Sequence, residues 1–370
     1  MTLRIGIYAR AAAEVPAGRG RFVRELLSAL AGLDADHRYV LYAREARADS
    51  NLDARFRWEL LDASDPTWNI RVGLTAQQGS DVFFSTNSYL TAWFTRVPTA
   101  LNVFDMIAWE APESAQKRAA RIERLTLRRA LRRAGHVFCN SDATRRDLLR
   151  RYEWASARTS VVPLAADEQF GDEIPEDSRE EVLRRLGLDR PFVLATGTIE
   201  PRKNLTRLID AFVGLPGDVK RTHLLALAGP RGWADEQILA RADEDRERVR
   251  ILGRVTDLEL IALYNSCAAF CYPSLYEGFG LPVLEAMRGG APVITSNVSS
   301  LPEVAGDAAE YVDPTSVAEI KSALERVLGD PRRRNELGRL GRERSRAYSW
   351  RATAVAMLRQ LEELGARTHS

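Results

Sequence analysis

Two glutamates flank a glycine–aromatic–glycine turn in the stretch PSLYEGFGLPVLEAM, residues 273–287. Glu277 precedes the turn formed by Gly278, Phe279 and Gly280, and a helix is expected to begin near Leu281–Pro282, because proline is tolerated in a first helical turn. Glycines let the backbone approach a ligand, and the N–H groups at a helix start attract an anion. Glu285, four residues into that helix, can accept two hydrogen bonds from the vicinal diol of a ribose. The pattern indicates a nucleotide-sugar site, and a plain strand-to-helix connection is the alternative.

A second candidate is GTIEPRKNL, residues 197–205. Arg202 and Lys203 follow the turn at Gly197 and precede an expected helix, for which Asn204 is the predicted N-cap. Arginine can hold a diphosphate through two hydrogen bonds, and lysine adds a point charge. The segment therefore favours a diphosphate site, and a solvated basic loop is the alternative.

No other chemistry is supported by the motifs. The sequence has no G-x-S-x-G nucleophile motif and no phosphate-binding P-loop. The carboxylate pairs in 34–36 and 243–245 have the spacing for a divalent cation, but their charged surroundings favour solvated surface. The four histidines, His37, His136, His223 and His369, have no ligand spacing. We therefore expect no metal and no cofactor, and a reaction that rests on positioning and charge.

Alternating strands and helices predict an α/β chain with two Rossmann-like, doubly wound domains facing each other across a cleft. The expected strands are 3–8, 39–43, 81–85, 99–104 and 136–140 in the first domain, and 192–197, 223–229, 249–253, 268–272, 291–295 and 309–313 in the second. The predicted domains are 1–165 and 166–348, followed by a helix in 349–370 that packs back on the first domain. Ligands of such folds bind beyond the carboxyl ends of the strands, which is where both candidate segments fall.

Length and composition agree with two soluble domains. A chain of 370 residues exceeds the size of one hydrophobic core. The longest uncharged run, residues 260–276, contains polar residues and proline, so no membrane span is expected, and Arg10 interrupts the short apolar stretch at the N-terminus, so no secretory signal is expected there. Three cysteines, Cys139, Cys267 and Cys271, cannot form a paired framework. A reducing, cytoplasmic setting is the expected location.

The segments GTIEPRKNLTRLIDAF and PSLYEGFGLPVLEAMRGGAPVITSNVSSLPEVAGDAA closely resemble the retaining glycosyltransferases of family 4, which have the GT-B fold. Glu277 and Glu285 match that family's pair of glutamates with seven residues between them. VPAGRGRFVRELLSAL is similar to the family's glycine loop and first helix, and HVFCNSDATRRDL to the last part of its N-terminal domain. The resemblance covers most of the chain, and its C-terminal motifs are the more specific.

This resemblance implies a role for each matching residue. Arg202 and Lys203 would stabilise the leaving diphosphate, Glu285 would hold the ribose, and Glu277 would orient the sugar. The other implied donor contacts are Gly18, Gly20, Gly197, Gly229, Val255, Gly278, Phe279, Gly280 and Leu281. The family's favoured mechanism is attack on the same face of the sugar, with the leaving phosphate accepting the acceptor's proton, so neither a protein nucleophile nor a metal is required.

One position departs from the family pattern. Many relatives carry His-Asp where this sequence has Phe104 and Asp105, and the histidine can bond a hydroxyl of the donor sugar. Asp105 is expected to act in catalysis and in sugar or acceptor binding. Phe104 cannot bond a hydroxyl, which favours a 6-deoxyhexose or pentose donor; otherwise the donor is a hexose such as mannose or glucose. The alternative is that Phe104 is only a strand-end core residue.

Residues 117–133 combine many arginines with Ile122, Leu125, Leu127 and Leu131. A basic amphipathic helix of this kind could rest on an anionic membrane surface near a lipid-linked acceptor, which would place the protein at the inner face of the membrane. A solvated face is the alternative, and lysine is so rare in this chain that arginine enrichment can reflect genome composition. Nucleic-acid binding is not expected, because aromatics are not interleaved with the charges.

The sequence is thus interpreted as a retaining transferase that moves a sugar from a nucleoside diphosphate donor to a glycan, lipid-linked or small-molecule acceptor. A nucleotide-sugar epimerase on the same scaffold and a non-catalytic nucleotide-sugar-binding subunit are the alternatives.

Overall fold

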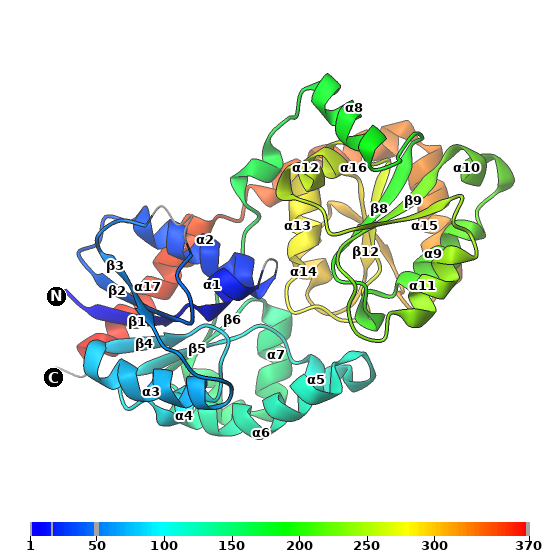
Figure 1. The fold of residues 1–370 in the computed structure, drawn as a ribbon. Helices are drawn as coiled ribbons and strands as arrows, with labels where there is room; N and C mark the ends of the chain where they lie inside the picture. Colours follow the sequence, from blue (N-terminus) through cyan, green and yellow to red (C-terminus); the bar gives the residue numbers. More distant parts are fainter. Residues whose placement is uncertain (1, 16–17, 48–51, 368–370) are drawn as a thin grey trace. The chain divides into compact units, whose positions relative to one another are not determined.

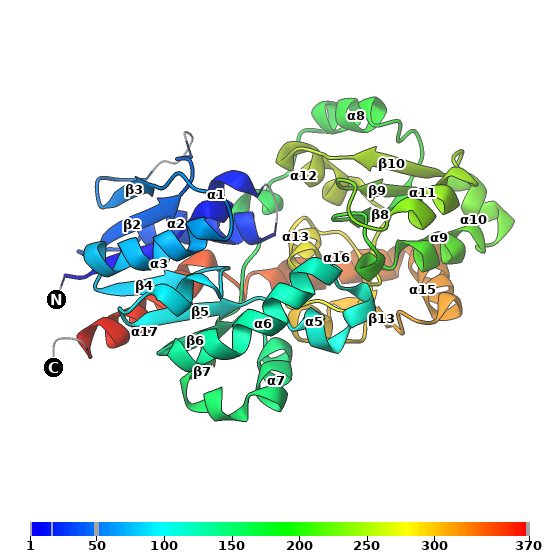
Figure 2. The same ribbon diagram turned by 60° about the horizontal axis from the view of Figure 1, so that its bottom comes forward.

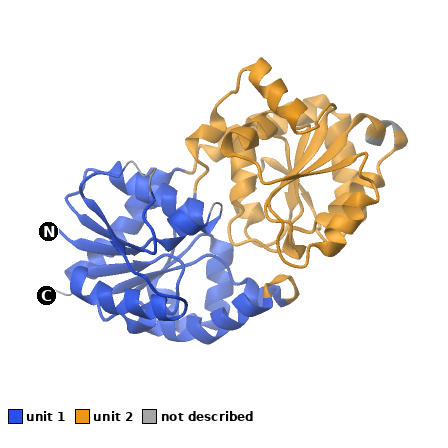
Figure 3. Ribbon diagram, in the orientation of Figure 1, with its two compact units in different colours: residues 1–112, 117–164, 349–370 blue, residues 113–116, 165–348 orange. Residues whose placement is uncertain are grey.

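The computed structural model describes residues 2–15, 18–47 and 52–367 of the chain. It divides into two compact units, one made of residues 1–112, 117–164 and 349–370 and the other of residues 113–116 and 165–348 (Figure 3). The first unit thus takes in the C-terminal residues, and the short segment 113–116 is grouped with the second unit.

The first unit is built on a sheet of parallel strands in the order β3-β2-β1-β4-β5-β6-β7 (Figure 1). The strands are β1 (Arg4–Tyr8), β2 (Arg38–Ala43), β3 (Phe56–Leu60), β4 (Val82–Ser85), β5 (Thr99–Val103), β6 (His136–Cys139) and β7 (Thr159–Val161). The helices are α1 (Arg10–Glu14), α2 (Arg19–Ala31), α3 (Thr67–Gly79), α4 (Thr91–Phe94), α5 (Ile107–Glu110), α6 (Lys117–Arg133), α7 (Asp142–Arg151) and α17 (Trp350–Ala366). The strand order reverses between β1 and β4, so the carboxyl ends of these two strands lie side by side.

The second unit has a parallel sheet in the order β10-β9-β8-β11-β12-β13. The strands are β8 (Phe192–Thr196), β9 (Leu224–Ala228), β10 (Val249–Gly253), β11 (Ala269–Tyr272), β12 (Val293–Ser296) and β13 (Ala309–Val312). The helices are α8 (Glu176–Arg185), α9 (Leu205–Val213), α10 (Gly217–Thr222), α11 (Glu236–Asp243), α12 (Asp257–Ser266), α13 (Leu281–Arg288), α14 (Leu301–Ala305), α15 (Val317–Gly329) and α16 (Pro331–Ser345).

Helices cover both faces of the second sheet, and each face has its own apolar core (Figure 2). One core is formed by side chains of α9, α11 and α15, and the other by side chains of α12, α13 and α14. Strands buried on both faces are continuous apolar runs such as FVLAT in β8. The strand order reverses between β8 and β11. The two central strands therefore present their carboxyl ends side by side.

Helix α17 packs on the first unit. The ring centroids of Trp350 and Phe22 are 6.2 Å apart, and the Thr353 hydroxyl donates to the Pro163 carbonyl at 2.7 Å. Further along, the Glu362 carboxylate lies 2.8 Å from the His37 ring. The helix is thus bound to the first unit by contacts along its length.

Every strand expected from the sequence has a counterpart, but β3 and β7 were not predicted. Strand β3 is an edge strand with the sequence FRWEL, and all of its residues are partly or fully exposed to solvent. Its apolar signal is accordingly weak. Strand β7 has only three residues and pairs in parallel with β6. Within the described residues, no helix is long and apolar enough to cross a membrane.

Candidate active site

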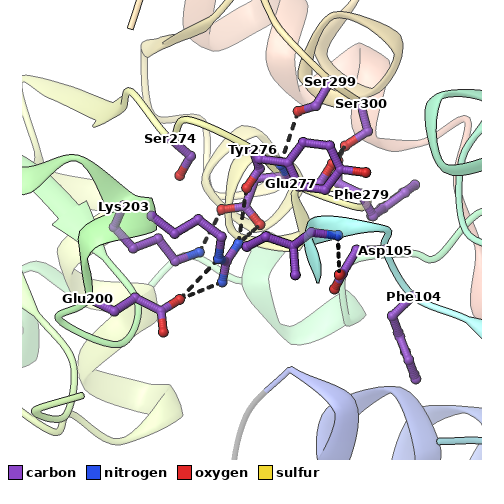
Figure 4. Close-up of polar contacts among 12 residues, drawn as sticks. Phe104, Asp105, Glu200, Lys203, Ser274, Tyr276, Glu277, Phe279, Ser299 and Ser300 are labelled. Carbon is purple, nitrogen blue, oxygen red and sulfur yellow. Dashed lines mark hydrogen bonds and ion pairs between the residues drawn. The ribbon is translucent and has the colours of Figure 1, made fainter. Parts of the chain in front are cut away.

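Three charged residues of the second unit meet where its strand order reverses. Arg202 and Lys203 lie in the turn after β8, and Glu277 lies in the loop between β11 and α13. Lys203 Nζ donates to Glu277 Oε1 at 2.7 Å, and an Arg202 Nη1–H group donates to Oε2 of the same carboxylate (Figure 4). Two segments separated by some 70 residues in sequence are thereby joined by one carboxylate.

The surroundings of this cluster are polar and buried. The Tyr272 hydroxyl donates to Glu277 Oε1 at 2.9 Å and accepts a hydrogen bond from Lys203. Arg202 also donates to Glu200 through Nη2 at 2.7 Å. The side chains of Lys203 and Glu277 are each 9% exposed. Because so little water reaches these groups, their charges act strongly on one another and on any ligand bound there.

Electrostatics keep Glu277 ionised. Burial alone would raise its pKa, but the positive charges of Arg202 and Lys203 outweigh burial and lower the pKa to about 2. Burial and the charge of Arg202 lower the pKa of Lys203, while Glu277 opposes that shift. Burial raises the pKa of Tyr272 far above its ordinary value, so its hydroxyl remains a donor to the carboxylate.

Backbone-directed hydrogen bonds fix the two loops. Asn204, in the left-handed conformation, donates from Nδ2 to the carbonyls of Pro273 (3.0 Å) and Pro314 (2.6 Å). Asn204 is the N-cap residue of α9, as predicted, but its side chain bonds these loops and does not cap the first turn of the helix. On the other loop, Ser299 Oγ accepts from the Glu277 N–H at 3.0 Å, and Ser300 Oγ donates to the Glu277 and Phe279 carbonyls.

Helix α13 begins at Leu281, as the position of Pro282 predicts, and Gly280 precedes it with a φ of 105°. Glu285, 5% exposed, lies within this helix, and the Tyr264 hydroxyl donates to its Oε2 at 3.5 Å. The same hydroxyl is 3.3 Å from the Thr196 hydroxyl at the end of β8. Glu285 is thus linked through the Tyr264 hydroxyl to Thr196 at the carboxyl end of β8, and its ribose-binding role stays a prediction.

Gly197 and Gly229 have a packing reason to be glycine. Both adopt positive φ, at 116° and 153°, and a Cβ on Gly229 would lie 2.0 Å from the Gly197 carbonyl oxygen. The ends of β8 and β9 can therefore touch only if residue 229 has no side chain. Val255, just after β10, is half-buried against the core.

In the first unit, the glycines at the start of α2 are also constrained. Gly18 has a φ of 54°, and a Cβ on Gly20 would lie 1.6 Å from the Val15 carbonyl oxygen. Arg19 is the first residue of α2. Residues 16–17 lie outside the described residues.

Phe104 and Asp105 follow β5 and are both half-buried. The Phe104 ring packs edge-on against Phe22 of α2 with centroids 5.1 Å apart, and the Arg19 guanidinium lies 5.4 Å from its centroid. Asp105 Oδ1 accepts a hydrogen bond from the Ile107 N–H at 3.1 Å (Figure 4). This packing favours the interpretation of Phe104 as a strand-end core residue.

Three further charged or polar groups of the first unit were missed from the sequence. Arg19 donates to Glu123 of α6 at 3.5 Å, and the charge of Asp105 acts on Arg19, Glu123 and Tyr89. Burial, followed by the charge of Asp105, raises the pKa of Glu123. An acidic residue inside an arginine-rich helix was the available signal for Glu123, and the position of Arg19 between two glycines was the signal for Arg19.

Comparisons with known proteins identify the family. A model described as Glycosyltransferase Family 4 matches residues 16–170, and one described as Glycosyl transferases group 1 matches residues 178–344. The chain is 34% identical over 275 residues to "O-antigen chain mannosyltransferase B" of Escherichia coli, covering 73% of this chain and 71% of that protein. It belongs to the family 4 glycosyltransferases.

Other relatives agree with this assignment. "MMP alpha-(1->4)-mannosyltransferase" of Mycolicibacterium hassiacum is 31% identical over 246 residues, which is 65% of this chain and 57% of that protein. Among solved structures, sucrose-phosphate synthase from Thermosynechococcus elongatus superposes with a TM-score of 0.79 at 21% identity, covering 98% of this chain and 99% of that one. The fold of this glycosyltransferase is therefore GT-B.

The described residues of the glycosyltransferase contain no group of three or more histidine, cysteine, aspartate or glutamate side chains placed to hold a metal ion. In the 243–245 segment, Asp245 pairs with Arg241 and Arg248. Cys139, Cys267 and Cys271 are buried and free.

Proposed function

We propose that this glycosyltransferase transfers mannose, with retention of configuration and without a metal, from a nucleoside diphosphate donor to a hydroxyl of a glycan. The observation that carries the proposal is the ionised Glu277 held between Arg202 and Lys203 at the point where the strand order of the second unit reverses. The mannosyltransferase relatives favour mannose as the sugar, and the first of them is named for a glycan chain.

In this proposal, Arg202 and Lys203 bind the diphosphate and stabilise the charge that develops as the bond to the sugar breaks. Their geometry is fixed in advance, so no reorganisation is needed when the charge appears. Glu277 positions the two cations and accepts hydroxyl hydrogen bonds from the sugar, which the backbone of 278–280 helps to orient. Glu285 holds the ribose, and Gly197, Gly229 and Val255 line the nucleotide.

The proposed same-face mechanism specifies which bonds break and form and where the acceptor proton goes. The bond between the sugar C1 and the diphosphate oxygen breaks, and a bond from C1 to the acceptor oxygen forms on that same face. The acceptor proton passes to an oxygen of the leaving phosphate, so no protein base is needed. The first unit, through Asp105 and the start of α2 at Gly18 and Gly20, would contact the acceptor and the donor phosphate.

The test is turnover with a panel of nucleoside diphosphate hexoses, mannose included, in the presence of a chelator and a mannose-containing oligosaccharide. Product formation with the donor's anomeric configuration, read by proton NMR, supports the proposal. An epimerase would convert the donor without any acceptor, and a binding subunit would not consume it even by hydrolysis. Either of these results would overturn the transferase assignment for this chain.

We further propose that α6 rests on an anionic membrane surface, where a lipid-linked glycan acceptor would be found. Leu127 and Leu131 are buried, whereas Ile122 and Leu125 are 50% and 67% exposed. The apolar residues of this helix therefore lie on two faces. The exposed pair shares the outward stripe with Arg118, Arg121, Arg128, Arg129 and Arg132.

An outward stripe of arginines around two apolar side chains is typical of interfacial helices. Vesicle co-sedimentation with and without phosphatidylglycerol tests the idea, using Ile122→Ser/Leu125→Ser as the variant. We expect the variant to bind anionic vesicles several-fold more weakly than the wild type, and equal binding would contradict the proposal.

A further inference from the structure

Four arginines line one hollow on the first unit, away from the carboxyl ends of its strands. The hollow has a volume of about 610 Å³, which is within the size range of small-ligand sites. Its lining residues are Thr95, Arg96, Val97, Pro98, Arg132, Arg133, Gly135, Leu364 and Arg367. None of these lining residues is acidic.

The hollow lies at the amino ends of the strands. Residues 95–98 precede β5, Gly135 precedes β6, and the arginines at 132 and 133 end α6. Arg367 follows α17, which also contributes Leu364. Three chain segments that are far apart in the sequence thus contribute arginines to the lining of one hollow.

Ordinary helix stabilisation explains only part of this arrangement. Basic residues in the last turn of a helix offset its negative end, which accounts for Arg132 and Arg133 on α6. This effect does not account for Arg96, because that residue lies in a loop. It also does not explain why the ends of two helices line one hollow that has no acidic lining residue. Arg133 is oriented by its hydrogen bond to the Thr95 carbonyl at 3.0 Å.

We propose that this hollow binds a phosphate group, carried either by a soluble phosphate ester or by a lipid headgroup. Guanidinium groups match phosphate oxygens in pairs, and several converging on one hollow can bond one phosphate from more than one side. Arg132 belongs to both this hollow and the outward stripe of α6, so a headgroup could reach it from a membrane surface.

The experiment compares Arg96→Ser/Arg132→Ser with Arg38→Ser/Arg146→Ser, a control that removes two exposed arginines of the first unit outside the hollow. One arm titrates inorganic phosphate against sodium chloride of equal ionic strength and follows the binding by phosphorus NMR. The other arm measures binding to phosphatidylglycerol vesicles. Arg96→Lys/Arg132→Lys keeps the charge but loses the paired geometry, and its binding should fall between the two.

We expect the hollow variant to bind at least one probe about tenfold more weakly than the control, because each lost hydrogen bond to a charged group is worth at least that factor. A loss in the phosphate arm identifies a soluble ester. A loss confined to vesicles identifies a headgroup if the single variant Arg96→Ser, which leaves the outward stripe of α6 intact, also shows it. Equal binding of variant and control in both arms would overturn the proposal. The Ile122→Ser/Leu125→Ser variant should keep its phosphate binding, so failure of the membrane proposal would be seen separately.

Discussion

The candidate charged residues of the two units differ in how far apart they lie and in how much of each side chain is exposed. In the second unit, Lys203 and Glu277 lie 2.7 Å apart, and each side chain is 9% exposed. In the first unit, Arg19 and Glu123 lie 3.5 Å apart, and their side chains are 45% and 17% exposed. Asp105 bonds only a nearby backbone N–H among the contacts described for its side chain.

This difference indicates a division of labour. Buried charges that each make two hydrogen bonds are held in one geometry before a ligand arrives, which suits the step that the proposed reaction has in common for all acceptors, the departure of a diphosphate. Looser and more solvated charges can adapt, which suits an acceptor that differs between members of one family. Breaking the first arrangement should therefore abolish turnover, whereas breaking the second should change stability or specificity.

The largest effect is expected for Glu277→Gln. The amide cannot balance both cations, so their orientation toward the diphosphate is lost, and kcat should fall roughly a hundredfold to a thousandfold. The matched first-unit change, Glu123→Gln, should lower kcat by less than about tenfold. Steady-state kinetics on both variants measures the contrast.

A surface control completes this comparison. Glu325→Gln removes a second-unit carboxylate that pairs with Lys321 at 3.6 Å and is 36% exposed. Its kcat should equal that of the wild type. If Glu123→Gln lowered kcat as much as Glu277→Gln does, the division of labour between the two units would be wrong.

The next effect is acid stability. The pKa of Glu277 is lowered to about 2 in the folded protein from a usual value of 4.5, so ionised Glu277 stabilises the fold above about pH 4.5. This contribution, about 3 kcal/mol, is lost as the pH falls from 4.5 toward 2. The difference in free energy of unfolding between wild type and Glu277→Gln should therefore shrink over that range. Denaturant titrations at several pH values measure it, and a difference independent of pH would contradict the assignment.

Much of the second-unit site could be predicted from the sequence, because its determinants are local. Gly280 and Pro282 mark the start of α13, and the apolar runs mark strands buried on both faces. Parallel topology then brings the strand ends together. The hydrogen bonds from the Asn204 side chain could not be predicted, because the carbonyls that accept them, those of Pro273 and Pro314, are distant in the sequence.

The first unit was harder for the same physical reason. Glu123 and Arg19 are separated by about 100 residues, and no motif in the sequence predicts that they contact each other. The outward orientation of Ile122 and Leu125 depends on which face of α6 packs on the sheet, and their composition alone does not decide it. Strand β3 was missed because an edge strand does not need an apolar run.

A smaller effect, of opposite sign, is expected for Glu123→Gln stability. Burial raises the pKa of Glu123 in the folded protein, so its ionised form costs stability at neutral pH. The glutamine variant should therefore be more stable than the wild type at pH 7. This gain should disappear below the ordinary carboxyl pKa of 4.5, where the group is protonated in both states. Thermal unfolding at pH 7 and pH 4 measures it, and a variant less stable at pH 7 would show that the bond to Arg19 outweighs burial.

The smallest effect is expected for Phe104→His. Phe104 packs on Phe22 and beneath Arg19, and imidazole can keep much of that contact, so stability should fall by only about 1 kcal/mol. If Phe104 is a core residue and the donor carries mannose, the ratio of kcat/KM for mannose to 6-deoxy donors should be unchanged. If the ring instead packs on a deoxy sugar, histidine would supply a hydroxyl partner and raise that ratio. Competition between the two donors measures it directly. A raised ratio would mean that the first unit takes part in donor selection. It would therefore contradict the separation of roles between the two units.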